Sequence, residues 1–483
     1  MAGCNDDFLA EKRDLSGYNE EVYMDEDMAQ AYVGYIYHLF QPGDGAATFV
    51  QNMNGNRGQF NENFTRTSEE LAGQTNWNRE WDGININQGH ALNYFGERMG
   101  SSIQNNVWTR LRQINLFLAE IDKHGLTEEQ TAPLKGQMLF WRAYQYFDLL
   151  RLYGGVPLVL EPQDPIVEEG DTRNEIPRST SSETLAQILA DLDAAASLLP
   201  GKWPADDWGR ITSGAALALK GRVLLTWASP LFNRSDDAAR WQAAYEANLA
   251  ARNELEANGF GLYANGDFEG GEAWENMWFD GVDNPEAVLV WVYNDVESDQ
   301  TQRNNGWEAA ARSEELLGEA AISPTRQMLD AFPMKDGKQP GDASSAYTYD
   351  PGKFYKDRDP RFYKTFVYNG ALWPYGGNSQ FRQWTYYWHS EEDAENPDES
   401  TEDDPNDSGI YLRKATDPDA SNASGNFDYS STNFMEMRFA EVILNLAESA
   451  IGIGNLGEGL ELIKAIRERA GLENLDGAYG LSA

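Results

Sequence analysis

The stretch that decides the fold runs from Leu134 to Pro162, LKGQMLFWRAYQYFDLLRLYGGVPLVLEP. Apolar side chains recur in it at helical spacing, and others fall on the remaining faces, so we expect a helix buried almost all round. These residues are Phe140, Ala143, Tyr144, Phe147 and Leu150 on one face and Met138, Trp141, Tyr146 and Leu149 on the others. Gly154 and Gly155 can end a helix in the left-handed conformation, and Pro157 cannot continue one. The pattern predicts a core helix followed by a short strand over residues 156–160.

Apolar periodicity predicts further helices on both sides of this segment. We expect a short helix over residues 28–40 and a longer one over 103–121, the latter being the antiparallel partner of the 134–152 helix. Thr180 and Glu183 have the spacing of a capping box, which predicts a helix that ends at Pro200. We expect the helix over residues 213–228 to be its partner. Small residues let that partner approach closely: Gly214, Ala215, Ala216, Ala218 and Gly221.

The C-terminal part predicts a last helical hairpin. Its first helix carries Phe439, Val442, Ile443, Leu446, Ala447 and Ala450, and its second carries Leu462, Ile466 and Ala470. Gly452, Gly454 and Gly457 satisfy the pattern GxGxxG, but a dinucleotide site needs a strand before the glycines. We expect a turn between two helices there.

Residues 235–435 have a different character. Helical patterns cover residues 238–257 and 324–331, and AVLVWVY at 287–293 reads as a buried strand. The rest is rich in Gly, Asn, Asp and aromatic residues, which indicates loops. The fold class is therefore mainly α, with helical hairpins as a scaffold and an irregular, loop-rich part that contains short strands.

Composition limits the classes of function. The 483 residues include 41% hydrophobic and 12% aromatic residues, enough for a large core. The formal net charge of −40, with only 38 Lys and Arg, argues against nucleic-acid binding, because phosphate contacts need clustered cations. An uncharged ligand or a protein partner fits this charge better.

The single cysteine, Cys4, allows no disulfide within the chain and no cysteine metal site. It follows Met1, Ala2 and Gly3, which resemble the end of a bacterial lipobox, where small residues precede an acylated cysteine. We expect a lipid anchor at Cys4 and a signal peptide that this sequence lacks; the alternative is an ordinary terminal cysteine. No run of about 18 apolar residues occurs in the sequence, so we expect no membrane-spanning helix.

Catalytic motifs are scarce. The sequence has four histidines and contains no HExxH motif, no GxSxG elbow and no Walker loop. With 78 carboxylates, some pair will fall at glycosidase spacing by chance, so carboxylates alone do not argue for hydrolysis. We expect the protein not to be an enzyme.

Tryptophans in polar loops are the best candidates for a ligand site. A flat indole can cover the apolar face of a sugar ring while neighbouring amides and carboxylates bind its hydroxyl groups. The alternative is that each ring packs under its own loop. The predicted ligand-binding residues, chosen from their loop context, are Trp77, Trp81, Trp307 and Trp384, with Asn76 and Asp82 as polar partners.

Residues 391–407, EEDAENPDESTEDDPND, hold ten acids and no Lys or Arg. The run could bind a structural calcium ion, but its spacing matches no EF-hand loop and its charges repel each other. We therefore favour a solvated loop. We expect no cofactor and no metal ligand beyond this calcium alternative.

The helix and exit at 134–162 resemble a hallmark of the SusD/RagB family of nutrient-binding outer-membrane lipoproteins. Four further segments agree in order with that family: GRITSGAALALKGRVLLTWASPLFN (209–233), SPTRQMLDAFPMKDGK (323–338), RDPRFYKTFVYNG (358–370) and MRFAEVILNLAES (437–449). The resemblance implies a scaffold of tetratricopeptide-like helix pairs. It also implies a surface lipoprotein of a Gram-negative outer membrane that binds oligosaccharides and hands them to a SusC-like, TonB-dependent transporter without performing chemistry.

Two alternatives stay open beside this interpretation. A peptide-binding RagB-like receptor would use the same scaffold, and a glycoside hydrolase would need two carboxylates facing each other across a cleft. We expect residues 1–16 to form a tether and 17–483 a single domain. Its helical scaffold would take about 17–257 and 434–472, and loop-rich ligand-binding insertions about 258–433. Because family members usually continue past the turn at 467–472, we also expect the chain to be shortened at its C-terminus.

Overall fold

The computed structural model describes residues 20–41, 70–73, 106–164, 170–282, 284–296, 303–320, 322–385, 399–401, 408–422 and 427–481. The chain divides into two compact units. Unit 1 comprises residues 1–40 and 108–199, and unit 2 comprises residues 41–107 and 200–483. Each unit is described by itself, and the single domain predicted for 17–483 stays a prediction.

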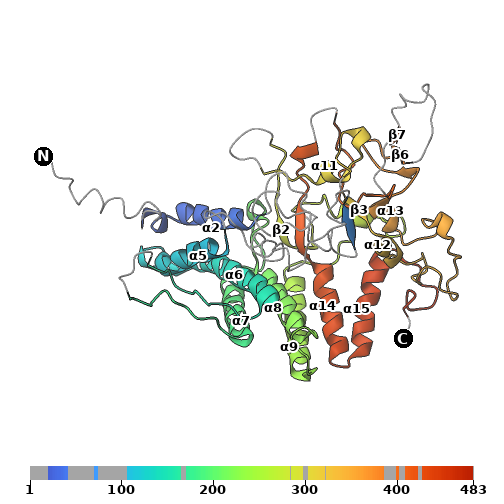
Figure 1. The fold of residues 1–483 in the computed structure, drawn as a ribbon. Coiled ribbons are helices and arrows are strands. Elements are labelled where there is room, and N and C mark those ends of the chain that lie inside the picture. The colour runs from blue at the N-terminus through green and yellow to red at the C-terminus, as the bar shows by residue number, and fades with distance from the viewer. Residues whose placement is uncertain are drawn as a thin grey trace. The chain divides into compact units, whose positions relative to one another are not determined.

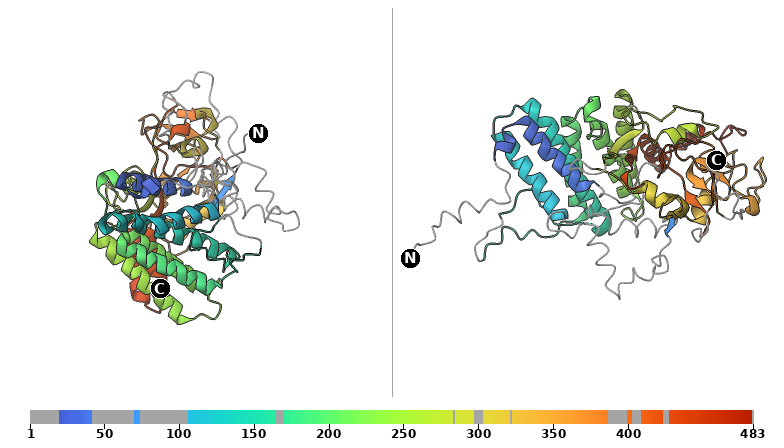
Figure 2. Two further views of the ribbon diagram at one scale, coloured as in Figure 1. Left: turned by 90° about the vertical axis from the view of Figure 1, so that its left-hand side faces the viewer. Right: turned by 90° about the horizontal axis from the view of Figure 1, so that it is seen from above.

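Unit 1 consists of helices α2 (Glu26–Phe40), α5 (Val107–Glu120), α6 (Glu128–Tyr153) and α7 (Ser181–Leu198), with short turns η2 (Glu20–Tyr23) and η6 (Ile121–Lys123). Figure 2 shows α2, α5 and α6 running side by side. The hydroxyl of Tyr32 on α2 donates to Gln113 Oε1 on α5 at 2.7 Å. Phe40 stacks on Trp141 of α6 with ring centroids 4.7 Å apart. Aromatic residues thus join these helices.

Helix α6 is the predicted core helix. Phe140, Trp141 and Tyr146 have no exposed surface, which confirms burial on several faces. The helix begins earlier than predicted, because Thr127 and Gln130 form a capping box. It ends as predicted at Gly154, whose φ is 73°. The prediction of a short strand over 156–160 is wrong, because this extended segment makes only one isolated bridge, between Pro157 and Arg178.

Helix α7 packs against α6. The capping box between Thr180 and Glu183 is confirmed, since the Thr180 side chain accepts from the Glu183 backbone N–H at 3.2 Å. A Cβ on Gly136 of α6 would lie 2.8 Å from Leu199 Cγ, so the absence of a side chain there permits the close approach. Arg142 of α6 forms a buried ion pair with Asp191 of α7, with Nη2 and Oδ1 2.7 Å apart.

Unit 2 contains helices α8 (Ser213–Ala228), α9 (Ala238–Ala257), α14 (Phe439–Gly452) and α15 (Leu456–Arg469). Figure 1 shows α14 and α15 as neighbouring helices, which is the predicted C-terminal hairpin. The predicted turn between them is confirmed: Gly454 lies in it with a φ of 82°, while Gly452 is the last residue of α14 and Gly457 belongs to the first turn of α15. Within the described ranges, no helix combines the length and apolar character needed to cross a membrane.

The predicted pairing of the 180–199 and 213–228 helices is wrong. The structure instead pairs α6 with α7 and α8 with α9. The small residues of α8 face α9: a Cβ on Gly214 would lie 2.5 Å from Leu255 Cδ2, and one on Gly221 would lie 2.2 Å from Asn248 Oδ1. The prediction that a neighbouring helix approaches the small residues of α8 closely is confirmed. The predicted identity of that helix is wrong, because composition does not say which helix fills the space.

The loop-rich part of unit 2 is built from short elements. Strand β2 (Ala287–Trp291) is fully buried, as predicted, and pairs antiparallel with β9 (Phe434–Arg438). The other strands are β1 (Leu71–Gly73) with β3 (Ile322–Pro324), β4 (Phe366–Val367) with β8 (Tyr411–Leu412), and β5 (Ala371–Leu372), β6 (Arg382–Trp384) and β7 (Glu399–Thr401) in one sheet. The short helices are η7 (Ala205–Asp207), α10 (Glu272–Asn276), α11 (Trp307–Ala311), η8 (Glu314–Leu316), α12 (Arg326–Ala331), η9 (Pro351–Lys353), α13 (Phe362–Thr365) and η10 (Phe427–Tyr429).

Charged groups are buried beside these short elements. Glu286 is fully buried and binds both Arg438 and Arg469. Both guanidinium groups also lie over the ring of Trp274, 5.3 and 5.8 Å from its centroid. One carboxylate therefore pairs with two cations beside aromatic rings, and contacts with the Trp274 ring add to their stabilisation.

Two further buried arginines bind backbone carbonyls of the loops. Arg312 donates to the carbonyls of Pro374 and Asp417, at 2.8 Å each. Arg358 donates to the carbonyls of Leu329 and Phe354, at 2.6 Å each. Buried carbonyl groups that lack a helix or sheet partner obtain their hydrogen bonds in this way.

Candidate ligand-binding site

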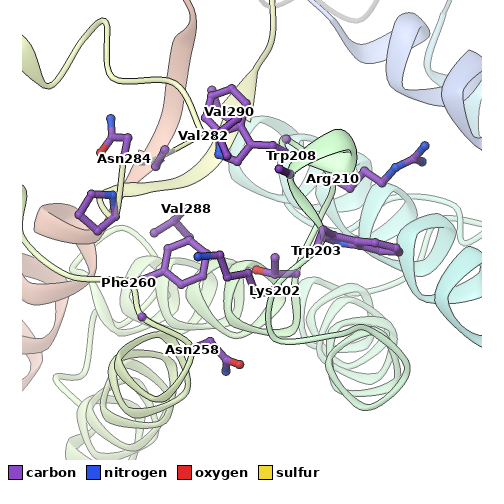
Figure 3. A pocket seen from close by; sticks show the side chains of 16 residues that line it. Lys202, Trp203, Trp208, Arg210, Asn258, Phe260, Val282, Asn284, Val288 and Val290 are labelled. Atoms are coloured by element: carbon purple, nitrogen blue, oxygen red, sulfur yellow. The ribbon is translucent and has the colours of Figure 1, made fainter.

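Unit 2 contains a cavity of about 330 Å³, shown in Figure 3. Its walls come from the loop between residues 202 and 212, from the end of α9 and from β2 with the loop before it. The lining residues are Lys202, Trp203, Ala205, Trp208, Gly209, Arg210, Thr212, Asn258, Gly259, Phe260, Val282, Asn284, Pro285, Ala287, Val288 and Val290.

The end of α9 places Phe260 in the wall. Gly259 has a φ of 85°, and its N–H donates to the Glu256 carbonyl. The Phe260 N–H reaches back to the Leu255 carbonyl at 3.0 Å, which completes the hydrogen-bond pattern of a Schellman motif. The direction of the Phe260 backbone is thus fixed by the glycine that ends the helix.

Two glycines allow the 202–212 loop to close over the cavity. A Cβ on Gly201 would lie 2.0 Å from Asn258 Oδ1, and one on Gly209 would lie 2.7 Å from Val292 Cγ2. A side chain at residue 201 would displace the Asn258 amide, and position 209 favours glycine in addition because its φ is 95°. The loop carries Trp203 and Trp208, both half-buried. The indole N–H of Trp203 donates to the Ile211 carbonyl at 2.8 Å, which holds this ring in place.

The opposite wall is mostly apolar. Ala287, Val288 and Val290 come from β2, which is buried along its whole length. The amide of Asn284 is already used, because its Nδ2 donates to the Met277 carbonyl at 2.7 Å and its Oδ1 accepts from the Glu286 N–H at 2.9 Å. This wall therefore offers shape and apolar surface rather than polar contacts.

The free polar groups come from the loop. The exposed Lys202 ammonium and the indole N–H of Trp208 have no hydrogen-bond acceptor among the residues that the structure describes. Arg210 is different, because its Nε lies 2.6 Å from Asp207 Oδ1 and its guanidinium group lies over the Trp203 ring at 5.8 Å. In Figure 3 the Arg210 side chain points away from Phe260, whereas Lys202 extends toward it.

This arrangement suits binding rather than chemistry. Aromatic rings and aliphatic side chains form the walls, and two unused donors are available to a ligand, as in sites that bind small polar molecules. The described lining residues include no Asp or Glu, so these residues by themselves offer no pair of carboxylates of the kind that glycoside hydrolysis needs.

Most of the predicted site residues lie outside the described residues. This holds for Trp77, Trp81, Asn76 and Asp82, and for Cys4. Their proposed roles in ligand binding and lipid anchoring therefore stay predictions.

Trp307 lies in the core. It has no exposed surface, and its indole N–H donates to the Lys414 carbonyl at 2.9 Å. A ring without an exposed face cannot cover a sugar, so the prediction that Trp307 contacts a ligand directly is wrong. The polar neighbours that suggested a binding loop serve the fold instead: Asn305 Oδ1 accepts from the Trp307 backbone N–H at 3.0 Å.

Trp384 keeps part of its surface exposed. It lies on β6, and its indole N–H donates to Glu399 Oε2 on β7 at 2.8 Å. Gly370 leaves room for its ring, because a Cβ there would lie 2.7 Å from Trp384 Cζ3. The ring is thus held in a defined orientation, and its role in ligand binding stays a prediction.

The sequence prediction did not include Trp203, Trp208 or Phe260. A signal was present, because KWPADDW at 202–208 places two tryptophans in a polar segment, as the segment with Trp77 and Trp81 does. We interpreted the segment as a connection between two helices. Phe260 carries no such signal, since it becomes part of a wall only through the end of α9.

The acidic run at 391–407 lies outside the described residues except for 399–401. Of those three, Glu399 binds the Trp384 N–H. Among the residues that the structure describes, no three His, Cys, Asp or Glu side chains are grouped as a metal site would require. The calcium alternative for this run stays a prediction.

Comparisons with known proteins agree on one family. Residues 285–481 match the model of the SusD family, and residues 7–225 match a model described as starch-binding associating with outer membrane. No curated protein matches the chain.

Solved structures share the fold. A SusD-like protein from Bacteroides fragilis is 23% identical, with a TM-score of 0.66 over 95% of this chain and 81% of that one. A SusD-like carbohydrate binding protein from the same species is 20% identical, with a TM-score of 0.68 over 93% and 79% of the two chains. A SusD homologue from Bacteroides thetaiotaomicron is 18% identical, with a TM-score of 0.63 over 97% and 82%. Two SusD-type family models together match most of the sequence, and the chain therefore belongs to the SusD/RagB family.

Proposed function

We propose that this protein is a glycan-binding lipoprotein of the cell surface, anchored in the outer membrane through Cys4. It captures oligosaccharides and delivers them to a SusC-like, TonB-dependent transporter. The observation that carries the proposal is the cavity of unit 2, where Trp203, Trp208 and Phe260 line one space together with two unused donors. The family assignment and the solved SusD-like carbohydrate binding protein support it.

The chemistry of the walls suits a sugar. The C–H faces of a pyranose ring are apolar and pack on indole or phenyl rings, while its hydroxyl groups need hydrogen-bond partners. The Trp208 N–H and the Lys202 ammonium can donate to hydroxyl oxygens. The chain is not an enzyme, because SusD-like proteins are non-catalytic. We therefore expect the bound oligosaccharide to remain intact.

Calorimetric titration against a panel of plant, host and microbial oligosaccharides tests this proposal, with release of reducing sugar assayed in the same samples. We expect saturable binding without release. Trp208→Ala should weaken that binding about tenfold or more, which corresponds to about 1.4 kcal/mol. Phe279→Ala, which removes a ring exposed outside the cavity, is the matched control and should leave the affinity unchanged.

Two outcomes would contradict the proposal. Turnover of any saccharide would overturn the assignment as a binding protein, and binding of peptides but not of saccharides would favour the peptide receptor. If Trp208→Ala lowers the melting temperature strongly, Trp208→Phe provides the test, because it keeps an aromatic ring while it removes the N–H donor and part of the indole surface. We then expect a smaller but measurable loss of affinity.

The anchor and the transporter need their own tests. With a signal peptide added, the chain should incorporate a radiolabelled fatty acid in a Gram-negative host, and Cys4→Ala should abolish the labelling. Labelling that persists in this variant would rule out the anchor. For delivery, a SusC-like transporter produced in the same cells should co-purify with the chain, and uptake of the bound oligosaccharide should require both proteins.

A further inference from the structure

The charged residues in the described lining of the cavity are basic, whereas the protein as a whole is acidic. The chain has 78 Asp and Glu but only 38 Lys and Arg. Nevertheless, no acidic residue occurs in the described lining, whereas Lys202 and Arg210 both do. A cavity whose lining followed the average composition would contain two or three acids. The described lining residues therefore carry two cations and no anion.

The two cations of the lining differ in their availability. Arg210 is neutralised by Asp207 and occupied by its contact with Trp203. Lys202 has no ion pair, no hydrogen bond and no aromatic contact within the described part of the chain, and its side chain extends toward Phe260 in Figure 3. One uncompensated positive charge is thus available to a bound molecule.

An available ammonium group between apolar walls favours an anionic ligand. A charge-assisted hydrogen bond between an ammonium and a carboxylate is roughly twice as strong as one between neutral groups, and the exposed Lys202 side chain lies at the cavity where a ligand can reach it. A protein with a net charge of −40 also repels anions at long range, so an acidic ligand needs a local cation. A neutral sugar would gain little from Lys202, because hydroxyl groups can equally bind water.

We infer that the cavity selects saccharides that carry a carboxylate, with Lys202 as the residue that recognises the uronic acid. The carboxylate binds the ammonium, and the sugar ring packs on the aromatic side chains Trp208 and Phe260. This inference rests on the proposed function and narrows it from oligosaccharides in general to acidic ones.

Pairs of ligands that differ only in charge test the inference. Disaccharides of galacturonate, glucuronate and mannuronate are titrated calorimetrically beside their methyl esters, which keep the ring and lose the charge. In at least one pair, we expect the acid to bind ten times more tightly than the ester at low salt. That preference should fall when salt is added, because ions screen the charges.

Variants assign the preference to one side chain. Lys202→Gln should make the acid and its ester bind equally, while Lys202→Arg should keep the preference. Lys353→Gln is the matched control, because Lys353 is also exposed, has no described partner and lies outside the cavity lining. It should behave as the unmodified chain does.

The inference is overturned if no acid binds more tightly than its ester, or if Lys202→Gln keeps the preference. Failure of the inference differs from failure of the proposed function. Neutral oligosaccharides that bind equally well, and whose binding Trp208→Ala weakens, would leave the proposed function standing and remove only the acidic selectivity. Absence of binding to every saccharide would remove both.

Discussion

The helix pair α6–α7 and the loop-rich residues 258–433 bury their polar backbone in different ways. In the helix pair, backbone groups satisfy one another, so the side chains need only supply an apolar interface and one buried ion pair. In the loops, the backbone has few regular partners. Buried guanidinium groups, such as those of Arg312 and Arg358, take their place.

This difference explains why a site can form in unit 2. A loop held by discrete polar contacts can leave a space between them, whereas a close-packed helical interface fills its own volume. The two regions should therefore respond differently to mutation. The loop-rich part should be most sensitive at its buried charges, and the helix pair at its apolar stripe.

Glu286→Gln should produce the largest effect on stability. It removes the carboxylate that pairs with both Arg438 and Arg469 and leaves the buried Arg469 and the partly buried Arg438 without this counter-charge. We expect the free energy of unfolding to fall by about 3–5 kcal/mol, measured by urea denaturation. Glu448→Gln, at an exposed site on α14, should change it by less than about 0.5 kcal/mol. Equal losses in both variants would show that the ion pairs of Glu286 contribute no more to the free energy of unfolding than an exposed carboxylate does.

Trp307→Ala should be nearly as costly, because it empties a fully buried site. A loss of about 3–5 kcal/mol is expected, again from urea denaturation. The measurement separates a core residue from a ligand contact: a variant that remained fully stable but lost saccharide binding would restore Trp307 to the binding site.

Leu192→Ala tests the apolar stripe of α7. Leu192 is fully buried, so its truncation leaves a cavity in unit 1 and should cost about 3 kcal/mol in the free energy of unfolding. Met28→Ala on α2 removes an exposed apolar side chain of the same unit and should cost little. Neither change should alter saccharide affinity, since neither residue lines the cavity. A loss of affinity in either variant would show that the helices do more than support the fold.

Thr180→Ala should have the smallest effect of this series. It removes the side-chain cap of α7, which is worth about 1 kcal/mol in comparable helices. Ser182→Ala, at the exposed second position of the same helix, is the control, because the Ser182 side chain makes no described cap, and it should be close to neutral. A thermal unfolding series of both variants checks this, and a loss for Ser182→Ala equal to that for Thr180→Ala would contradict a role for the capping box.

Much of the helical scaffold could be predicted from the sequence, because its signals are local. The Thr180 cap, the stop at Gly154 and the turn at Gly454 each depend on residues within a few positions. The pairing of the helices could not be predicted in this way. Gly221 indicates a close contact with another helix, but only the fold shows that Asn248 fills the space beside it.

The site was less accessible to prediction. A tryptophan among polar residues looks the same in sequence whether it lines a cavity, as Trp208 does, or fills the core, as Trp307 does. The difference lies in which distant segment covers the ring. For Trp307 the backbone carbonyl that takes its N–H belongs to Lys414, more than a hundred residues further along the chain.

The sequence by itself determined the helices, their ends, the buried strand β2 and the acidic character of the chain, because each follows from local periodicity, capping or composition. The tertiary structure decided which helices pair, which tryptophans are buried and that Lys202, at the cavity, has no side-chain partner among the described residues. These depend on contacts between segments far apart in the chain. The sequence shows which side chains are available for such contacts, but it does not show which of them lie next to each other in the fold.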